Sequence, residues 1–434
     1  MEDWQINQSP REQRPEPADF SKVRASNPAP PQLRQLAEVL IEAGALQRPA
    51  LAKRVGISKQ AVSELLSVLE QRGLVQVAGP LNGLPGRSSL SYALRPDAAL
   101  ALGFDIGGTK IAAAPVDLRG KVLAETVVPT APGGLDQLVG QLVELADSSA
   151  KTAGAQRFRV QAATVGVPAA VNPATGILNL AANLPGLVAV DLHARLTKAL
   201  NCPVSIENDV NLALLGEVAS GSGQGKRDIA FVALGTGVGA GLMVNGRLLR
   251  GATGGAGEIA YLPLPDHRTT ARSLAQGHFE TMVGEAGIRE AFARRGGAAD
   301  MSVRAIFDLA TTGDVRALQT IDELAGHVAP GIVSLIALVD PELVVLGGSV
   351  GARPELIERV QAELAARFER PVPIVASNTG SRAGLAGALR NSAAAFAGGS
   401  VWRGVRGPKP VAALLRIVSR QPSSSRWAGD AGRR

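Results

Sequence analysis

The sequence is poor in cysteine: its 434 residues include only Cys202. A single cysteine cannot build a disulfide framework, and nothing else in the chain points to secretion. Long apolar runs are also missing, since none reaches ~18 residues and residues 1–30 are polar and rich in proline. We therefore expect a cytoplasmic protein with neither a signal peptide nor a transmembrane helix.

The common phosphate-binding motifs are absent as well. The stretch Phe104-Asp105-Ile106-Gly107-Gly108-Thr109-Lys110 lies between two apolar runs, which is typical of a strand, a tight glycine turn and a second strand. It lacks the G-x-x-x-x-G-K-[ST] spacing of a Walker A loop, and the β-rich sequence after it excludes the Rossmann fingerprint. Adjacent glycines can still present bare N–H groups to an anion, while Asp105 could hold a metal or water and Lys110 could add charge. The alternative is an ordinary hairpin turn with a polar edge.

The apolar content and the charge distribution indicate several folded parts. A hydrophobic fraction of 46% over this length allows sizeable cores in two or three domains. The net charge of +7 is unevenly spread, because residues 31–95 and 400–434 are basic whereas the remainder is mildly acidic. A basic N-terminal module beside an acidic body is compatible with DNA contact by that module.

Residues 31–95 predict a winged helix-turn-helix. Apolar residues recur at helical spacing from Leu33 to Ile41, a short helix follows over 48–55, and Ser58 caps a third helix over 59–72. Two strands, over 74–77 and 89–94, would form the wing. The third helix of such a module enters the major groove, although Glu64 on it is an awkward neighbour for DNA. A helical module for protein contact is the alternative. The expected DNA-binding residues are Ser58, Lys59, Gln60, Ser63 and, on the wing, Arg87.

From residue 98 onward the pattern is α/β and partly repeats itself. The strand over 229–234 leads into Gly235-Thr236-Gly237-Val238-Gly239, which echoes the first glycine turn, and Gly347-Gly348 forms a third turn. A glycine turn in each half suggests two similar lobes facing a cleft, where ligands prefer to bind. We expect four segments: a disordered leader (1–30), the winged helix-turn-helix domain (31–95), the two-lobed domain (98–397) and a basic, disordered tail (398–434).

With these pieces in place, the chain resembles the ROK family, which joins repressors and sugar kinases. The resemblance covers residues 31–397, and its seven motifs stand in family order. They are Asp105-Ile106-Gly107-Gly108-Thr109-Lys110, Asn183-Leu184-Pro185-Gly186, Glu207-Asn208-Asp209-Val210-Asn211, Gly235-Thr236-Gly237-Val238-Gly239, Gly254-Gly255-Ala256-Gly257-Glu258, Gly277-His278-Phe279-Glu280 and Leu346-Gly347-Gly348.

The resemblance implies an actin-like, hexokinase-like α/β fold with two duplicated, ribonuclease H-like lobes. It implies that the nucleotide phosphates are held by Asp105, Gly107, Gly108, Thr109, Lys110, Gly235, Thr236 and Gly237, with Gly347 and Gly348 beside the adenosine. It also implies sugar contacts from Asn183, Asn208, Asp209, Glu258, Tyr261 and Glu280, with Asp209 as the catalytic base of a kinase.

The residue types agree with these roles, although each has a plainer alternative. Carboxylates and amides suit sugar hydroxyls, and a carboxylate in hydrogen-bond reach of one hydroxyl can act as its general base. Taken alone, Glu258 and Glu280 would be surface carboxylates, Asp209 could be a helix N-cap and Asn183 could serve a turn.

The chain departs from the family at its structural zinc site. Most members use one histidine and three cysteines, but the matching positions in this sequence hold Tyr261, Ala271, Ser273 and His278. A lone histidine cannot build a tetrahedral site, and the nearby His267 does not complete it. We predict that zinc is absent and that residues 262–277 are held by packing or form a mobile loop. Tyr261 also puts the choice of sugar in question.

The DNA-binding module favours a regulator, because kinases of this family generally lack it. The first hypothesis is a sugar-responsive transcriptional repressor that requires no cofactor, binds DNA as a homodimer or tetramer and has no membrane partner. The second is a sugar kinase with ATP and Mg²⁺, because Asp209 and the phosphate turns are intact. A co-regulator that docks on another protein is a third hypothesis.

Overall fold

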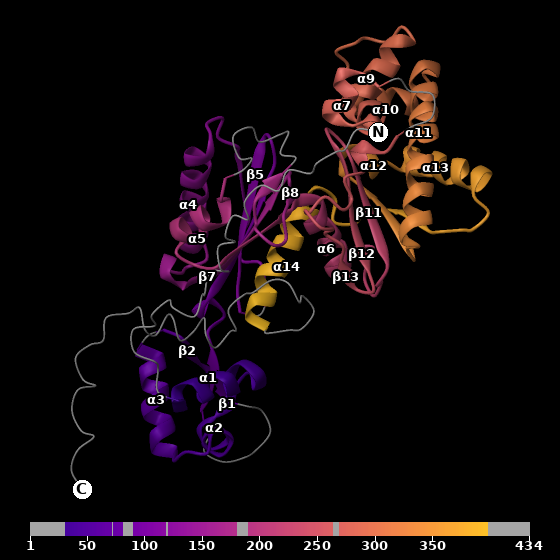
Figure 1. The fold of residues 1–434 in the computed structure, drawn as a ribbon. Coiled ribbons are helices and arrows are strands. Elements are labelled where there is room, and N and C mark those ends of the chain that lie inside the picture. The colour runs from indigo at the N-terminus through magenta and orange to yellow at the C-terminus, as the bar shows by residue number, and fades with distance from the viewer. Residues whose placement is uncertain are drawn as a thin grey trace, which may run out of the picture.

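A computed structural model describes residues 31–71, 73–80, 90–118, 120–179, 190–263 and 269–397. The expected leader (1–30) and tail (398–434) lie outside these ranges. Figure 1 shows a small N-terminal domain followed by two α/β lobes, with helices α6 and α14 between the lobes.

The N-terminal domain is a winged helix. Ser58 Oγ accepts a hydrogen bond from Ala61 N at 3.1 Å, so the predicted cap of the third helix is present. Gly56, at φ 75°, ends the second helix in the left-handed region. Its three-stranded antiparallel sheet has the order β1-β3-β2, in which the two-residue β1 was not predicted. The elements are α1 (Pro31–Ala43), β1 (Leu46–Gln47), α2 (Arg48–Val55), α3 (Lys59–Gln71), β2 (Val75–Pro80) and β3 (Leu90–Leu94).

The first lobe contains a five-stranded sheet of order β10-β7-β4-β5-β6. Parallel pairs join β10, β7 and β4, whereas β5 and β6 are antiparallel, as expected for the hairpin around the first glycine turn. The apolar spacing predicts a strand over 122–128, whereas β6 is shorter and begins at Thr126. The elements are β4 (Leu100–Ile106), β5 (Lys110–Val116), β6 (Thr126–Pro129), α4 (Leu135–Thr152), β7 (Val160–Val167), β8 (Ala170–Val171), β9 (Leu178–Asn179), α5 (Leu192–Leu200) and β10 (Val204–Asn208).

The second lobe repeats this layout with a sheet of order β13-β12-β11-β14-β15. Its strands are β11 (Ile229–Leu234), β12 (Val238–Val244), β13 (Arg247–Leu248), β14 (Leu343–Gly347) and β15 (Ile374–Ala376), and its helices are α7 (Ala271–Gln276), α8 (His278–Val283), α9 (Glu285–Arg294), α10 (Val303–Thr311), α11 (Val315–Val339), α12 (Gly348–Gly351) and α13 (Pro354–Arg367).

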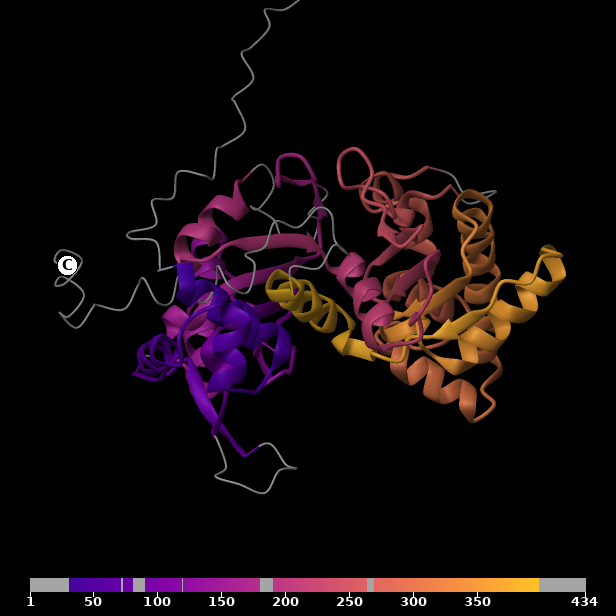
Figure 2. The ribbon, with the colours of Figure 1, turned by 90° about the horizontal axis from the view of Figure 1, so that it is seen from below.

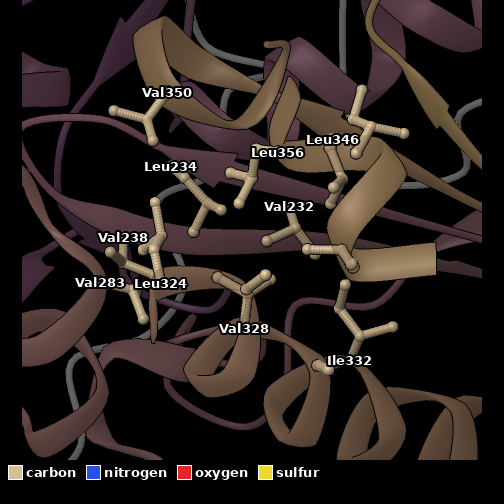
Figure 3. Packing of buried hydrophobic residues seen from close by; sticks show 14 of the residues in the cluster. Val232, Leu234, Val238, Val283, Leu324, Val328, Ile332, Leu346, Val350 and Leu356 are labelled. Carbon is tan, nitrogen blue, oxygen red and sulfur yellow. The ribbon is translucent and has the colours of Figure 1, made fainter. Parts of the chain in front are cut away.

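The core of the second lobe is built around α11. In Figure 3, Leu324, Val328 and Ile332 of this helix point toward strand residues such as Val232 and Leu346. By length and composition α11 could cross a membrane, but its buried apolar face makes it a core helix of this lobe.

One expected helix is interrupted. The sequence predicts a single helix over 280–295, but α8 ends at Val283 and α9 begins at Glu285. Glu285 N donates to Gly235 O at 3.0 Å, so the start of α9 is bound to the second glycine turn. A Cβ at Gly284 would lie 2.8 Å from Glu280 O, which favours glycine at the break.

Helices α6 (Asp209–Ser220) and α14 (Ala383–Ala397) cross between the lobes at very short distance. A Cβ at Gly387 would lie 1.8 Å from Leu212 O, and one at Gly216 would lie 2.5 Å from Ala383 O. After the second lobe the chain thus returns along α14 to the first, as Figure 2 shows from below.

The winged helix and the first lobe share one hydrophobic core. This shared core joins Leu36 and Leu66 of the winged helix with Ala101 of β4 and with Leu385 and Leu389 of α14. At its edge, Arg159 donates hydrogen bonds to Gly73 O at 3.0 Å and to Asp97 O at 3.1 Å. The end of α3 is therefore attached to the base of the first lobe.

Candidate functional site

Four carboxylates that the sequence motifs identified interact with one another between the lobes. Asp105 ends β4, Asp209 begins α6, Glu258 precedes a short 3₁₀ turn and Glu280 lies in α8. Burial, followed by the negative charge of Asp105, raises the pKa of Asp209 to about 7, and Glu258 adds to the effect. Burial raises the pKa of Asp105 to about 6, which the positive charge of Lys110 opposes.

The two glutamates continue this cluster toward the second glycine turn. Burial and the charge of Glu280 raise the pKa of Glu258. Burial also raises the pKa of Glu280, although Glu280 Oε2 accepts a hydrogen bond from Val238 N at 2.9 Å. Such a set of half-buried acceptors suits the hydroxyls of a sugar.

Asn208, and not Asp209, caps α6. Asn208 Oδ1 accepts from Asn211 N at 3.0 Å, and Asn208 Nδ2 donates to Ala169 O at 3.2 Å. Asp209 Oδ1 accepts only a local bond from Val210 N at 2.9 Å among the contacts of the described residues. The capping role that Asp209 alone could have had belongs to its neighbour, which leaves the Asp209 carboxylate at the helix start for ligand chemistry.

The first glycine turn closes a hairpin. Gly107 N donates to Lys110 O at 2.8 Å, and Thr130 Oγ1 donates to Gly107 O at 2.8 Å. Gly108, Thr109 and Lys110 are exposed at the tip. The turn is therefore held from behind, with its polar edge beside Asp105.

The second and third glycine turns adjoin each other. A Cβ at Gly348, whose φ is +82°, would lie 2.2 Å from Leu234 O, so only glycine fits there. A Cβ at Gly235 would lie 3.0 Å from Ser349 Oγ. Gly237 borders the carboxylate of Glu280, and Thr236 is exposed. These backbone turns place Gly348 and Ser349 next to Leu234 and Gly235.

A pocket of about 620 Å³ opens next to these turns. Ser349 Oγ donates to Glu285 Oε1 at 3.1 Å in its lining, which holds three arginines and three carboxylates. This size is that of a small-molecule site. No sequence motif marks its lining, which comes from α9, α10, α12 and the loops before α10 and α13 and includes Glu285, Arg289, Asp300, Ser302, Arg304, Asp308, Ser349 and Arg353.

Two of the four positions that replace the zinc ligands, Ala271 and Ser273, lie in the short helix α7, whereas His278 begins α8 and Tyr261 ends a 3₁₀ turn. Thr270 and Ser273 make a reciprocal capping box at the start of α7, so the Ser273 hydroxyl is used within the helix. Tyr261 is 43% exposed, and its hydroxyl donates to Ala275 O at 3.4 Å. Residues 269–277 are thus held by packing and capping. His267 lies outside the described residues, and the absence of zinc stays a prediction.

The N-terminal turns of α3 present the expected DNA-binding face. Lys59 and Gln60 are exposed, and Gln60 Nε2 donates to Glu64 Oε1 at 3.3 Å, which gives the awkward Glu64 a partner. The hydroxyls of Ser58 and Ser63 bond within the helix, since Ser63 Oγ donates to Lys59 O at 3.0 Å. Arg87 on the wing and Asn183 of the sugar set lie outside the described residues.

The sequence motifs did not connect two residues that form an ion pair near the site. Arg250 Nε lies 2.7 Å from Glu207 Oε2, across the boundary between the lobes. Glu207 stands inside a quoted motif, but its partner is 43 positions away in a loop, so no local pattern connects them.

The comparisons agree with this geometry. The ROK family matches residues 101–392, and the MarR family matches residues 27–81. The bifunctional enzyme NanE/NanK of Brucella melitensis is 32% identical over 321 residues, which are 71% of this chain and 57% of that enzyme. The chain thus spans little more than half the length of this relative.

Two solved structures have the same fold. A ROK family glucokinase from Streptomyces griseus, solved with glucose and AMPPNP, is 27% identical with a TM-score of 0.57 and covers 68% of this chain and 99% of its own. A ROK family transcriptional regulator homologous to the E. coli MLC protein is 20% identical with a TM-score of 0.63 and covers 89% and 98%. The predicted fold class is confirmed, and the chain belongs to the ROK family, with a MarR-like winged helix preceding its two-lobed domain.

Proposed function

We propose that this protein is a cytoplasmic, sugar-responsive transcriptional repressor that binds DNA as a homodimer. The observation that carries the proposal is the complete winged helix, with Lys59 and Gln60 exposed on α3, attached by a shared core to the lobe that holds Asp105. Similarity along 89% of the chain to a regulator's fold supports this two-part architecture.

In this proposal the sugar binds among the interlobe carboxylates. Asp209, Glu258 and Glu280 accept hydrogen bonds from its hydroxyls, and Asn208 donates through the second proton of its amide. Asn183 and Tyr261 complete the sugar set that the motifs imply. A sugar that contacts both lobes favours the closed arrangement over the open one, which shifts the population of DNA-binding conformers.

The test is binding to the protein's own upstream DNA in an electrophoretic mobility assay, followed by a sugar panel. We expect a shifted band at low salt and its release by one sugar. A Lys151→Ala variant, altered at an exposed residue of α4, should behave as the wild type. Failure to bind any fragment of the genome at low salt would contradict the proposal.

A second candidate function, ATP-dependent sugar phosphorylation, is favoured by the raised pKa of Asp209. A base with a pKa of about 7 is well matched to accept a hydroxyl proton near neutral pH. The carboxylate oxygens of Asp105 and Asp209 suit Mg²⁺, which would neutralise phosphate charge, and the pocket beside Gly235 would take the nucleoside. The glucokinase relative holds glucose and AMPPNP.

A coupled assay for ADP release over a sugar panel separates the two functions. Turnover by the wild type that is lost in Asp209→Asn would assign kinase activity. Sugar-dependent release of DNA without turnover would leave the repressor as the sole function.

A further inference from the structure

Residues 250–258, which we call the strap, lie on both lobes at once. Gly257, at φ +92°, lies on the second lobe, where a Cβ would be 1.9 Å from Ala240 O of β12. Gly254, at φ +91°, lies on the first lobe, where a Cβ would be 2.1 Å from Val171 O of β8. The strap therefore spans the lobe boundary, and its last residue is Glu258 of the sugar set.

An ion pair between the buried Glu207 and the partly exposed Arg250 holds the first residue of the strap to the first lobe. Arg250 Nε donates to Glu207 Oε2 at 2.7 Å, and Glu207 is only 6% exposed. The other oxygen of Glu207 accepts from Asn211 Nδ2 at 3.0 Å and from Asn208 N at 3.1 Å. Both oxygens of this carboxylate are thus used, one toward the strap and one toward the start of α6.

The carboxylate of Glu207 connects the two halves of the candidate sugar site. On one side it contacts Asn208, the residue that precedes Asp209. On the other side, Arg250 O accepts from Ala256 N at 3.1 Å, so the arginine shapes the strap that carries Glu258. Removing one partner of a buried ion pair leaves an uncompensated charge that recruits water or a proton.

We propose that Glu207 and Arg250 form a positioning pair that sets the distance between the Asn208–Asp209 half and the Glu258 half of the sugar site. This inference rests on the proposed sugar binding. The pair determines sugar affinity by fixing the residues on either side of it, without contacting the sugar.

Calorimetric titration of the full chain with the sugar panel tests this role. Arg250→Gln should raise the sugar Kd at least about tenfold, because a buried carboxylate loses its charged partner. Arg250→Lys keeps the charge but not the planar guanidinium, so its sugar Kd should lie between the values of the wild type and Arg250→Gln. Arg247→Gln, at an exposed position of neighbouring β13, is the matched control and should bind like the wild type.

Hydrogen exchange without any ligand provides a readout that is independent of sugar. Arg250→Gln should increase exchange in residues 204–211 and 250–258, whereas Arg247→Gln should not. If Arg250→Gln folds poorly, the double variant Glu207→Gln with Arg250→Gln should recover stability, because no unpaired charge then remains, while its Kd stays raised.

The outcomes separate the two proposals. Unchanged sugar affinity in Arg250→Gln would overturn the positioning role. A wild type that binds no sugar of the panel would overturn the proposed function. The hydrogen-exchange experiment would still decide whether the Glu207–Arg250 pair holds the strap. Equal exchange in Arg250→Gln and Arg247→Gln would overturn that role.

Discussion

At the scale of single residues, Asp209 is maintained at an energetic cost. Burial and the charge of Asp105 raise its pKa to about 7 from an ordinary value of 3.8. A raised carboxyl pKa means that the folded state binds the proton more tightly than the unfolded chain. The favourable contribution to folding is complete below pH 3.8 and is lost as the pH rises toward 7. Carboxylates whose charged form is destabilised by burial and by a neighbouring charge are typical of functional sites.

Asp209→Asn should therefore be more stable than the wild type at pH 8. The amide has no charge to bury, so we expect a rise in Tm on the order of 2–4 °C, which corresponds to about 1 kcal/mol in a domain of this kind. The difference should vanish near pH 4, where the wild-type carboxyl is protonated in the folded state. Thermal melts across this range measure it, with Glu144→Gln on the exposed face of α4 as control. A pH-independent difference would contradict the burial of a carboxylate charge as its cause.

Lys59→Ala should weaken DNA binding in one of two distinguishable ways. If Lys59 contacts phosphate, affinity falls evenly across sequences and the slope of log K against log salt decreases by about 1. If it contacts a base edge, the loss is about 1–3 kcal/mol and preference relaxes at one position. Fluorescence anisotropy over a salt series and an operator library separates these outcomes. Unaltered affinity and specificity would remove Lys59 from the interface.

At the scale of elements, the crossing of α6 and α14 depends on glycine. The carbonyl of Leu212 occupies the space where a side chain at Gly387 would begin, so neither helix can move away without disturbing its own lobe. Asn391 and Ser392 of α14 also bond to the buried Thr164 of β7, Ser392 Oγ at 2.8 Å. The position of α14 along the first lobe is thus specified by backbone contact and by buried polar groups.

Gly387→Ala should destabilise the protein by about 2–3 kcal/mol, because the methyl group overlaps a backbone carbonyl that cannot rotate away. The matched control is Gly140→Ala in α4, where a Cβ would meet nothing within 4 Å. That change should raise stability by about 0.5–1 kcal/mol through lower backbone entropy in the unfolded chain. Denaturant melts measure both effects. Equal effects of the two substitutions would refute the close crossing.

The sequence predicted the helices and strands better than the contacts between them. Helical periodicity and the Ser58 cap located the winged helix, and the glycine turns located both hairpins, because these signals are local. The split at Gly284 was missed, since it follows from a bond between α9 and the second glycine turn. The sequence predicts a helix over 382–395, close to the bounds of α14, but not its return to the first lobe, because helical periodicity does not say which sheet a helix covers.

The candidate site was predictable where motifs are short and ordered. The carboxylates at 105, 209, 258 and 280 lie on four different elements, and only the resemblance grouped them before the structure brought them together. Glu207 lies in a quoted motif, but no signal connected it to Arg250. The charged pocket near Gly235 was missed because its residues come from several helices and the loops before α10 and α13, with no shared spacing.

At the scale of the whole molecule, the winged helix is not an independent unit. Its apolar residues continue without interruption into β4 and α14, and Arg159 attaches the end of α3 to the first lobe. The second lobe has its own core around α11. Cooperative units tend to follow shared cores, so the winged helix should open together with the first lobe and not as a small separate domain.

Leu389→Ala, at a position 6% exposed in the shared core, should test this division. Loss of a buried leucine costs about 2–5 kcal/mol, and the cost should appear in the opening free energies of both α3 and β4. Ile332→Ala in α11 is the converse substitution and should weaken the second lobe alone. Native-state hydrogen exchange measures both. Loosening of β4 without α3 in Leu389→Ala would show that the winged helix opens separately.

The shared core also determines what can act as a lever in this molecule. Because the winged helix shares a core with the first lobe, closure of the two lobes would move the winged helix and the first lobe together relative to the second lobe. In a homodimer joined through its second lobes, that movement would change the distance between the two winged helices. In a homodimer joined through its first lobes, the distance between the two winged helices would stay fixed while the second lobes moved. Which lobes form the dimer contact therefore decides whether sugar binding can change the affinity for operator DNA.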